Sequence, residues 1–245
     1  MKKSLNRSEI ERFSRQLVLK NIGPKGQKKI ISSKILIVGV GGLGCPAAEN
    51  LVRAGIGTIG LIDNDVVNLS NIHRQSLYDS KDIKKLKVSV AAKKLKAINP
   101  LTRIKIYKSR LNKKNIDNII KNYEIIIDGS DNFKTKFLIN NYCIKFKKKL
   151  ITGAISKFDG HIFTFDFKNK KTASLRDFYQ EKEISDDILN CEFDGIIGTT
   201  ASIVGATQAN EALKMVMEIG QNLKNQILII DLLNLNFRKV RFKKK

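Results

Sequence analysis

Short apolar runs alternate with amphipathic stretches along most of the chain. Each run has the length of a buried strand, and each stretch between two runs carries apolar residues at helical spacing. We expect strands at residues 34–38, 58–63, 103–107, 124–128 and 149–155, and helices at residues 45–54, 82–98, 112–121 and 132–146. Strands that alternate with helices in this way build a mostly parallel, doubly wound α/β sheet.

The pattern differs at both ends of the chain. Residues 8–31 have helical spacing with polar interruptions, and Ser8-Glu9-Ile10-Glu11 resembles a capping box. Beyond Gly160 we expect an antiparallel strand at 161–167, a helix at about 199–219 and strands at 226–231 and 236–242. No element is evident at 168–195, so we expect a flexible crossover loop at about 170–195. Antiparallel strands should therefore extend the sheet in the C-terminal part of a single domain, residues 1–245.

The chain is strongly basic, with 46 Lys and Arg residues, 23 Asp and Glu residues and a net charge of +23. Such a charge is compatible with a nucleic-acid partner. However, only 10 of the basic residues are arginine, and the lysines lack interleaved aromatic residues or a nucleic-acid motif. We interpret them as solvated surface lysines that suit an acidic partner, and we do not expect nucleic acid as a partner.

Hydropathy and cysteine usage indicate the compartment. No apolar run reaches the roughly 18 residues of a membrane helix, and the polar segment from Met1 to Glu11 has no signal-peptide core. The cysteines, Cys45, Cys143 and Cys191, form no CxxC pair. This argues against a disulfide framework and a cysteine zinc site. We expect a cytoplasmic protein without a membrane partner, in which Cys45 and Cys143 are packing residues.

A glycine-rich turn follows the first expected strand. Gly39, Gly41 and Gly44 match G-x-G-x-x-G, with Gly42 added. Glycines at this place let the backbone approach a phosphate and direct helix N–H groups towards it. Asp63 follows Gly44 by 19 residues, at the end of the second strand, where a carboxylate can accept hydrogen bonds from ribose hydroxyls. The turn predicts a Rossmann-like nucleotide site, and leaves open whether the nucleotide carries hydride or is consumed.

Charged and polar residues come next along the chain. Asp65 is followed by Ser70, Asn71 and Arg74, and then by Lys87 on the next expected helix. Arginine and lysine near a phosphate site supply positive charge for a triphosphate, and hydride chemistry does not need it. Either residue alone could equally belong to a solvated face. Together they favour a nucleotide that is consumed.

A second polar segment, from Asp128 to Asn132, follows a later strand. Ligands bind at the carboxyl ends of strands in open α/β sheets, so this segment belongs at the same edge as the glycine turn. An aspartate beside phosphates is a natural Mg²⁺ ligand, which makes Asp131 a candidate. Asp131 could instead be the N-cap of the following helix, and it could serve in both ways.

These motifs, taken together and in order, resemble those of the E1-like adenylyltransferases of ThiF, MoeB and HesA type. The resemblance covers about residues 8–242 and rests on these segments: Arg12-Phe13-Ser14-Arg15-Gln16-Leu17, Gly39–Gly44, Asp63-x-Asp65, Ser70-Asn71-x-x-Arg74-Gln75, Lys87, Ser130-Asp131-Asn132 and Cys191. It implies that residues 1–245 form one ThiF-type adenylylating domain. It also implies ATP-dependent adenylation of the C-terminal Gly-Gly carboxylate of a ubiquitin-like sulfur carrier of ThiS or MoaD type. Pyrophosphate is released, and the step activates sulfur transfer for thiamine or molybdenum cofactor biosynthesis.

The resemblance also implies roles for individual residues. The nucleotide-binding positions are Gly39, Gly41, Gly42, Gly44, Asp63, Asp65, Ser70, Asn71, Arg74, Lys87, Asp131 and Asn132. Among them, Asn71, Arg74 and Lys87 would neutralise the triphosphate and the charge developing at its α-phosphate. Asp131 would hold Mg²⁺. Arg15 matches a family arginine that reaches into the partner subunit's site, which implies a homodimer with shared catalytic sites.

Sulfur chemistry is implied by Cys191, which matches the family's loop cysteine. Its thiolate could link covalently to the carrier or take part in sulfur transfer, whereas an inert buried cysteine is the alternative. We expect a separate sulfur donor, a cysteine desulfurase or a rhodanese. Many relatives bind zinc through two CxxC pairs, but here the first pair falls at Ser174 and Asp177, so we expect no zinc.

Three other functions fit part of the sequence. A dehydratase of the tRNA threonylcarbamoyladenosine type also uses ATP, and a basic surface would suit it. An NAD(P)-binding oxidoreductase is supported by the glycine turn and Asp63 alone. A non-catalytic scaffold is disfavoured because the catalytic candidates are all present, namely Arg15, Arg74, Lys87 and Asp131.

Overall fold

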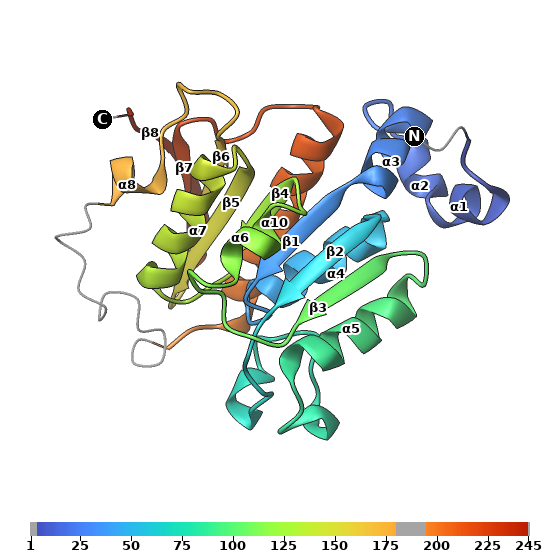
Figure 1. The fold of residues 1–245 in the computed structure, drawn as a ribbon, viewed down its shortest axis with the longest axis horizontal. Helices are drawn as coiled ribbons and strands as arrows, with labels where there is room; N and C mark the ends of the chain where they lie inside the picture. The colour runs from blue at the N-terminus through green and yellow to red at the C-terminus, as the bar shows by residue number, and fades with distance from the viewer. Residues whose placement is uncertain (1–3, 180–194, 245) are drawn as a thin grey trace.

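The computed structural model describes residues 4–179 and 195–244 of the chain (Figure 1). Its centre is one eight-stranded sheet with the strand order β3-β2-β1-β4-β5-β6-β7-β8. The strands are β1 (Lys34–Val38), β2 (Thr58–Ile62), β3 (Arg103–Tyr107), β4 (Ile125–Asp128), β5 (Lys149–Ser156), β6 (Asp159–Asp166), β7 (Gln226–Asp231) and β8 (Asn236–Arg241). The first five are parallel, and β6 to β8 continue the sheet antiparallel. This confirms the expected doubly wound sheet with an antiparallel extension.

Helices cover both faces of the sheet, because the buried strands are apolar on both sides. In β1, Ile35 and Ile37 belong to a core shared with α4 (Gly44–Ala54), α5 (Lys87–Ile98) and α10 (Gly198–Met217). Leu36 and Val38 point to the other face, where α6 (Ile116–Ile120) and α7 (Phe133–Lys145) close a second core. The chain therefore builds three layers (Figure 1).

The N-terminal region forms three helices, α1 (Arg7–Arg12), α2 (Ser14–Leu17) and α3 (Gly23–Ser32), beside one end of the sheet (Figure 1). Ser8 does not cap the first helix as expected. Asn6 is the N-cap, because its side chain accepts a hydrogen bond from the Glu9 N–H and the Glu9 carboxylate accepts one from the Asn6 N–H, each 2.9 Å long. The capping box was thus predicted two residues too late.

Two helices are shorter than expected because polar side chains turn the backbone before them. Helix α5 begins at Lys87 and not at 82: Ser80–Asp82 form a 3₁₀ turn, and Leu86 makes an isolated bridge with Val66. Helix α6 begins at Ile116 and not at 112, because Asn112 and Asn115 side chains accept hydrogen bonds from backbone N–H groups in this turn.

One helix appears where no element was expected. The short helix α8 (Leu175–Phe178) begins at Ser174, whose N–H and hydroxyl both donate to the Asp177 carboxylate, at 2.7 and 2.8 Å. Phe178 and Tyr179 then contact the ring of Phe163. Residues 180–194 of the predicted crossover loop, including Cys191, lie outside the described residues. Within the described part of the chain, no helix is both long and apolar enough to cross a membrane.

Candidate functional site

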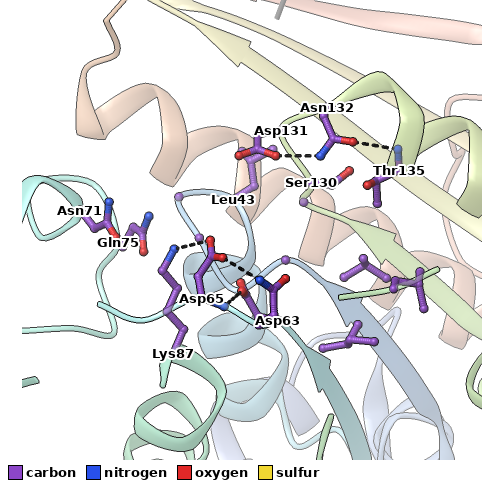
Figure 2. Close-up of a pocket in the computed structure, with 18 of the residues that line it drawn as sticks. Leu43, Asp63, Asp65, Asn71, Gln75, Lys87, Ser130, Asp131, Asn132 and Thr135 are labelled. Atoms are coloured by element: carbon purple, nitrogen blue, oxygen red, sulfur yellow. Dashed lines mark hydrogen bonds and ion pairs between the residues drawn. The ribbon is translucent and has the colours of Figure 1, made fainter. Parts of the chain in front are cut away.

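A cavity of about 550 Å³ lies at the carboxyl ends of the parallel strands (Figure 2). Its position follows from the strand order: from β1 the chain winds outwards through β2 and β3, whereas β4 and β5 lie on the other side. The connections on either side of β1 and β4 leave in opposite directions, which opens a crevice there. Residues of both predicted polar segments line this crevice.

The glycine turn after β1 forms the floor of the cavity. Gly39 has a φ of +83°, and a Cβ built on it would lie 2.9 Å from the Gly129 carbonyl oxygen. Gly39 and Gly44 therefore allow the turn to pack, since a Cβ on Gly44 would collide with the Gly39 carbonyl. Gly41 and Gly42 line the cavity itself, whereas Gly44 does not. The outer glycines thus shape the turn, and the inner two give a ligand access to the backbone.

Asp63 joins the glycine turn to the end of β2. Its carboxylate accepts hydrogen bonds from the N–H groups of Val40 (2.8 Å) and Asp65 (2.9 Å). Burial raises the pKa of this carboxyl above its ordinary value, although both hydrogen bonds act in the opposite direction. The protein therefore holds a partly buried acid at the cavity wall, in the place expected for a ribose ligand.

One wall carries positive charge. The Lys87 side chain is 8% exposed and its Nζ lies 3.3 Å from the Asp65 carboxylate, while Arg74 donates to the Ser70 carbonyl at 2.8 Å. Both cations line the cavity, as does Asn71, whose side chain accepts a hydrogen bond from the Asn68 N–H. Ser70 does not line it. Ser70 instead anchors Arg74 through its backbone, a contact that the sequence pattern does not reveal.

Asp131 stands on the opposite wall (Figure 2). It is exposed, and Asn132 donates a hydrogen bond of 3.0 Å to its carboxylate. Asn132 is also the N-cap of α7, because its side chain accepts from the Thr135 N–H at 2.9 Å. The N-cap alternative for Asp131 is therefore wrong, because the helix begins one residue later than that alternative requires.

The residues present fit a nucleotide with a magnesium ion. The Gln75 side chain is 4% exposed beside Gly41, and its Oε1 atom has no hydrogen-bond partner among the described residues. An unpaired buried polar atom at a cavity wall indicates that a ligand completes the site. No group of three acidic, histidine or cysteine ligands occurs in residues 4–179 and 195–244. Mg²⁺ fits such a site, since it binds through one or two carboxylates together with phosphate and water oxygens.

Comparison with known proteins decides the family. The ThiF family profile matches residues 13–245. The chain belongs to the ThiF family. It is 39% identical over 236 residues to a probable molybdopterin-synthase adenylyltransferase of Gracilaria tenuistipitata, covering 96% of this chain and 66% of the relative. It is 36% identical over 237 residues to a sulfur carrier protein adenylyltransferase of Thermus thermophilus, covering 96% and 88% of the two chains.

Solved structures agree with the fold of this ThiF-family protein. MccB of E. coli, crystallised with ATP, matches 98% of this chain and 73% of its own length, with a TM-score of 0.85 and 21% identity. PaaA matches with a TM-score of 0.82 and 22% identity, over 100% of this chain and 77% of its own. At such identities the likeness concerns the fold. Several curated relatives are longer, since this chain spans about half of a Drosophila willistoni adenylyltransferase and sulfurtransferase named MOCS3.

Besides Gly44 and Ser70, one further predicted residue described in this ThiF-family protein, Arg15, does not line the cavity. Arg15 is exposed on α2. Its neighbour Gln16 donates to the Ala54 carbonyl at 3.4 Å, and Arg12 donates to the Ile98 carbonyl at 3.1 Å. Ala54 ends α4, which starts at the glycine turn, so Arg15 lies towards the other end of the sheet. Cys191, another predicted site residue, falls outside the described residues.

The other two cysteines are confirmed as packing residues. Cys45 and Cys143 are fully buried on α4 and α7. Burial raises the pKa of the Cys45 thiol to about 12 and holds the pKa of the Cys143 thiol well above its ordinary value. Neither thiol is therefore available as a thiolate nucleophile at neutral pH.

Sequence reasoning missed several cavity residues. Gln75 stood in a quoted motif but was given no role. Arg110 lines the cavity after β3, and no sequence signal distinguished it in so basic a chain. Lys136 also lines the cavity, although it is only 3% exposed. It lies between Thr135 and Phe137 on a helix, where a lysine is normally interpreted as a surface residue.

Proposed function

We propose that this protein adenylates the C-terminal Gly-Gly carboxylate of a ubiquitin-like sulfur carrier and releases pyrophosphate. Membership of the ThiF family and the names of its relatives support an adenylyltransferase that serves a sulfur carrier or molybdopterin synthase. Adenylation would activate a ThiS-type or MoaD-type carrier for sulfur transfer in thiamine or molybdenum cofactor biosynthesis. Residues 1–245 would act as one adenylylating domain.

One observation carries the proposal: the glycine turn lies between a cationic wall and a carboxylate. Figure 2 shows Lys87 on one side of the turn and Asp131 on the other, and Arg74 also lines the cavity. A dinucleotide that is merely held needs no such cations, whereas a triphosphate that is cleaved develops charge that they can stabilise. ATP would therefore lie with its phosphates along the turn.

The proposed reaction is an exchange at the α-phosphate of ATP. A carboxylate oxygen of the carrier attacks this phosphorus, the bond to the β-phosphate bridging oxygen breaks, and pyrophosphate leaves with both bonding electrons. Lys87 and Arg74 would stabilise the departing negative charge. Mg²⁺, when bound, supplies further charge neutralisation to the phosphates, and Asp131 would hold it.

The rest of the nucleotide would follow the strand order. Asp63 would accept hydrogen bonds from the ribose, because its carboxylate stands at the end of β2. The base would then lie beyond the ribose, towards the end of β3, where Ile62, Arg110 and Leu111 line the cavity. The carrier terminus would enter from the opposite side, beside Ala154 and Ile155.

The partners are proposed from the same family resemblance. A homodimer would let Arg15 of each subunit complete the site of the other, which suits its exposure away from its own cavity. A cysteine desulfurase or a rhodanese would supply sulfur. Cys191 would form a covalent carrier link or take part in sulfur transfer, and full sulfur transfer by Cys191→Ser would exclude that role. We also propose that no zinc is bound.

Carrier-dependent exchange of labelled pyrophosphate into ATP tests the proposal. The wild-type protein should catalyse exchange only when a Gly-Gly-ending carrier is present, and Asp131→Ala should abolish it because the magnesium ligand is lost. Asp117→Ala is the matched control, since Asp117 is a 42% exposed carboxylate that pairs with Lys145 outside the cavity. Absence of exchange with carriers of both types would exclude the proposed reaction.

A further inference from the structure

A buried carboxylate lies directly behind the Asp131 wall. Asp128 ends β4 and is 1% exposed. Its Oδ1 atom accepts hydrogen bonds from the Ser130 N–H (2.9 Å) and the Ser130 hydroxyl (2.6 Å). Its Oδ2 atom accepts from the Thr152 hydroxyl (2.5 Å) and from Lys136 Nζ (3.2 Å). Four donors thus surround one carboxylate at the base of the Ser130–Asp131 turn.

Lys136 closes this network from α7. Its side chain is 3% exposed, and its Nζ also donates to the Gly153 carbonyl on β5 at 2.6 Å. On the remaining side, Gln208 of α10 donates to the backbone carbonyl of Asp128 at 2.9 Å. Burying an ion pair this completely is seldom a net gain in stability, because two charges lose their hydration. We therefore look for the contribution of this ion pair in the geometry that it imposes on the residues around it.

The geometry in question is the packing of the Ser130–Asp131 turn against the glycine turn. A Cβ on Gly39 would lie 2.9 Å from the Gly129 carbonyl, so the segment after Asp128 packs directly on the glycine turn. Asp128 also holds Ser130, the residue after Gly129, through two hydrogen bonds, and Asp131 follows Ser130 in the chain. The Asp131 carboxylate itself takes no part in the network. The hydrogen bonds of Ser130 therefore hold Asp131 at the cavity wall, and the Asp131 carboxylate stays available to a ligand.

We infer that Asp128 and Lys136 form a positioning pair, which acts through Ser130 to hold Asp131 against the glycine turn for metal–nucleotide binding. The inference rests on the proposed function, in which Asp131 holds the magnesium ion. Neither Asp128 nor Lys136 touches the reacting atoms in this account. Removing a residue that supports a metal ligand typically weakens metal binding by about 10-fold to 100-fold.

Two hydroxyl groups provide a matched test, because each donates one hydrogen bond to the Asp128 carboxylate. Ser130→Ala removes the side-chain one of the two bonds that connect this carboxylate to the Asp131 turn, and Thr152→Val removes the bond from β5. The measurement is the ratio of the ATP Kd without Mg²⁺ to the ATP Kd with Mg²⁺, by titration calorimetry. Ser130→Ala should lower this ratio about 10-fold, whereas Thr152→Val should leave it within about twofold at a similar loss of Tm.

A double-mutant cycle separates positioning from direct contact, since Ser130 also lines the cavity. If Ser130 acts through Asp131, then Ser130→Ala should not lower the Mg²⁺ ratio further in an Asp131→Ala protein. Lys136→Arg should keep the wild-type ratio, and Lys136→Met should lose it. Equal effects of Ser130→Ala and Thr152→Val, or additivity with Asp131→Ala, would overturn the inference. Failure of the wild-type protein to bind ATP would instead overturn the proposed function on which it rests.

Discussion

At the scale of single residues, the cavity trades stability for a binding geometry. Asp63 is the clearest case, because its carboxyl is buried at the end of β2 and its pKa is raised above the ordinary value. Ionised, it accepts backbone hydrogen bonds from Val40 and Asp65 and presents a charge to the cavity. The protein therefore keeps an acid where a neutral side chain would be less costly to fold around.

This conflict gives a pH-dependent prediction for Asp63→Asn. A raised carboxyl pKa favours the protonated form in the folded state, so its stabilising contribution is complete below the unfolded value near 3.8. It is lost as the pH rises through the folded value. The free energy of unfolding of the wild type, relative to Asp63→Asn, should therefore fall as the pH is raised from below 3.8 to neutrality.

Denaturant unfolding of both proteins across this pH range measures the difference. Asp117→Asn serves as the control, because the Asp117 carboxylate is exposed and paired with Lys145 on the surface. At neutral pH, Asp63→Asn should bind ATP more weakly than the wild type although it is the more stable protein. A difference in unfolding free energy that grows with pH would contradict the account of Asp63.

Many of the cavity residues were predictable from the sequence, because their spacing relative to the expected strands and helices indicates where they lie. Gly41 and Asp63 follow strands β1 and β2, and Lys87 begins the helix α5, so the strand order and the connections after these strands bring them to one edge. Lys136 could not be predicted, because its burial depends on Asp128 and Gly153, which come from two other strands. Ser70 was predicted to bind nucleotide, but it does not line the cavity, and its carbonyl accepts a hydrogen bond from Arg74.

At the scale of elements, the strands were the most predictable parts of the chain. The apolar runs at 34–38, 103–107 and 226–231 match β1, β3 and β7 to the residue. Helix starts were less predictable, since 82–98 has helical spacing throughout but the helix begins at Lys87. The start depends on the bridge between Val66 and Leu86, which is a tertiary contact that periodicity does not report.

The α8 region shows how a local device can order a segment. Ser174 and Asp177, where the family resemblance places a CxxC pair of many relatives, here form a capping box. The rings of Phe178 and Tyr179 then pack against Phe163, a residue of β6. Hydrogen bonds and aromatic packing thus hold this segment against the antiparallel part of the sheet. Ser174 could not be predicted as an N-cap, because no helix was expected after it.

At the scale of the whole molecule, Arg15 raises the question of assembly. It is exposed on α2, and its neighbours Arg12 and Gln16 bond to the carboxyl ends of α5 and α4. The glycine turn lies at the opposite end of α4. If Arg15 serves catalysis, it must therefore serve the cavity of a second copy, which is the homodimer that the family resemblance implies.

Subunit complementation tests this arrangement. Arg15→Ala and Asp131→Ala homodimers should each be inactive in carrier-dependent pyrophosphate exchange. After the two proteins are mixed and allowed to exchange subunits, activity should recover to about one quarter of the wild-type level. Half of the dimers are then mixed, and each mixed dimer has one intact site of two. No recovery, despite subunit exchange demonstrated with labelled chains, would show that Arg15 does not act in the partner's site.

The central claim is that the cavity transfers an adenylyl group to a carrier carboxylate. Intact-mass spectrometry of a Gly-Gly-ending carrier, incubated with this protein, ATP and Mg²⁺, tests it most directly. The account predicts a carrier species heavier by one adenylyl group that requires the terminal glycine and is absent with Asp131→Ala. If ThiS-type and MoaD-type carriers both keep their original mass while the protein binds ATP, the claim is contradicted.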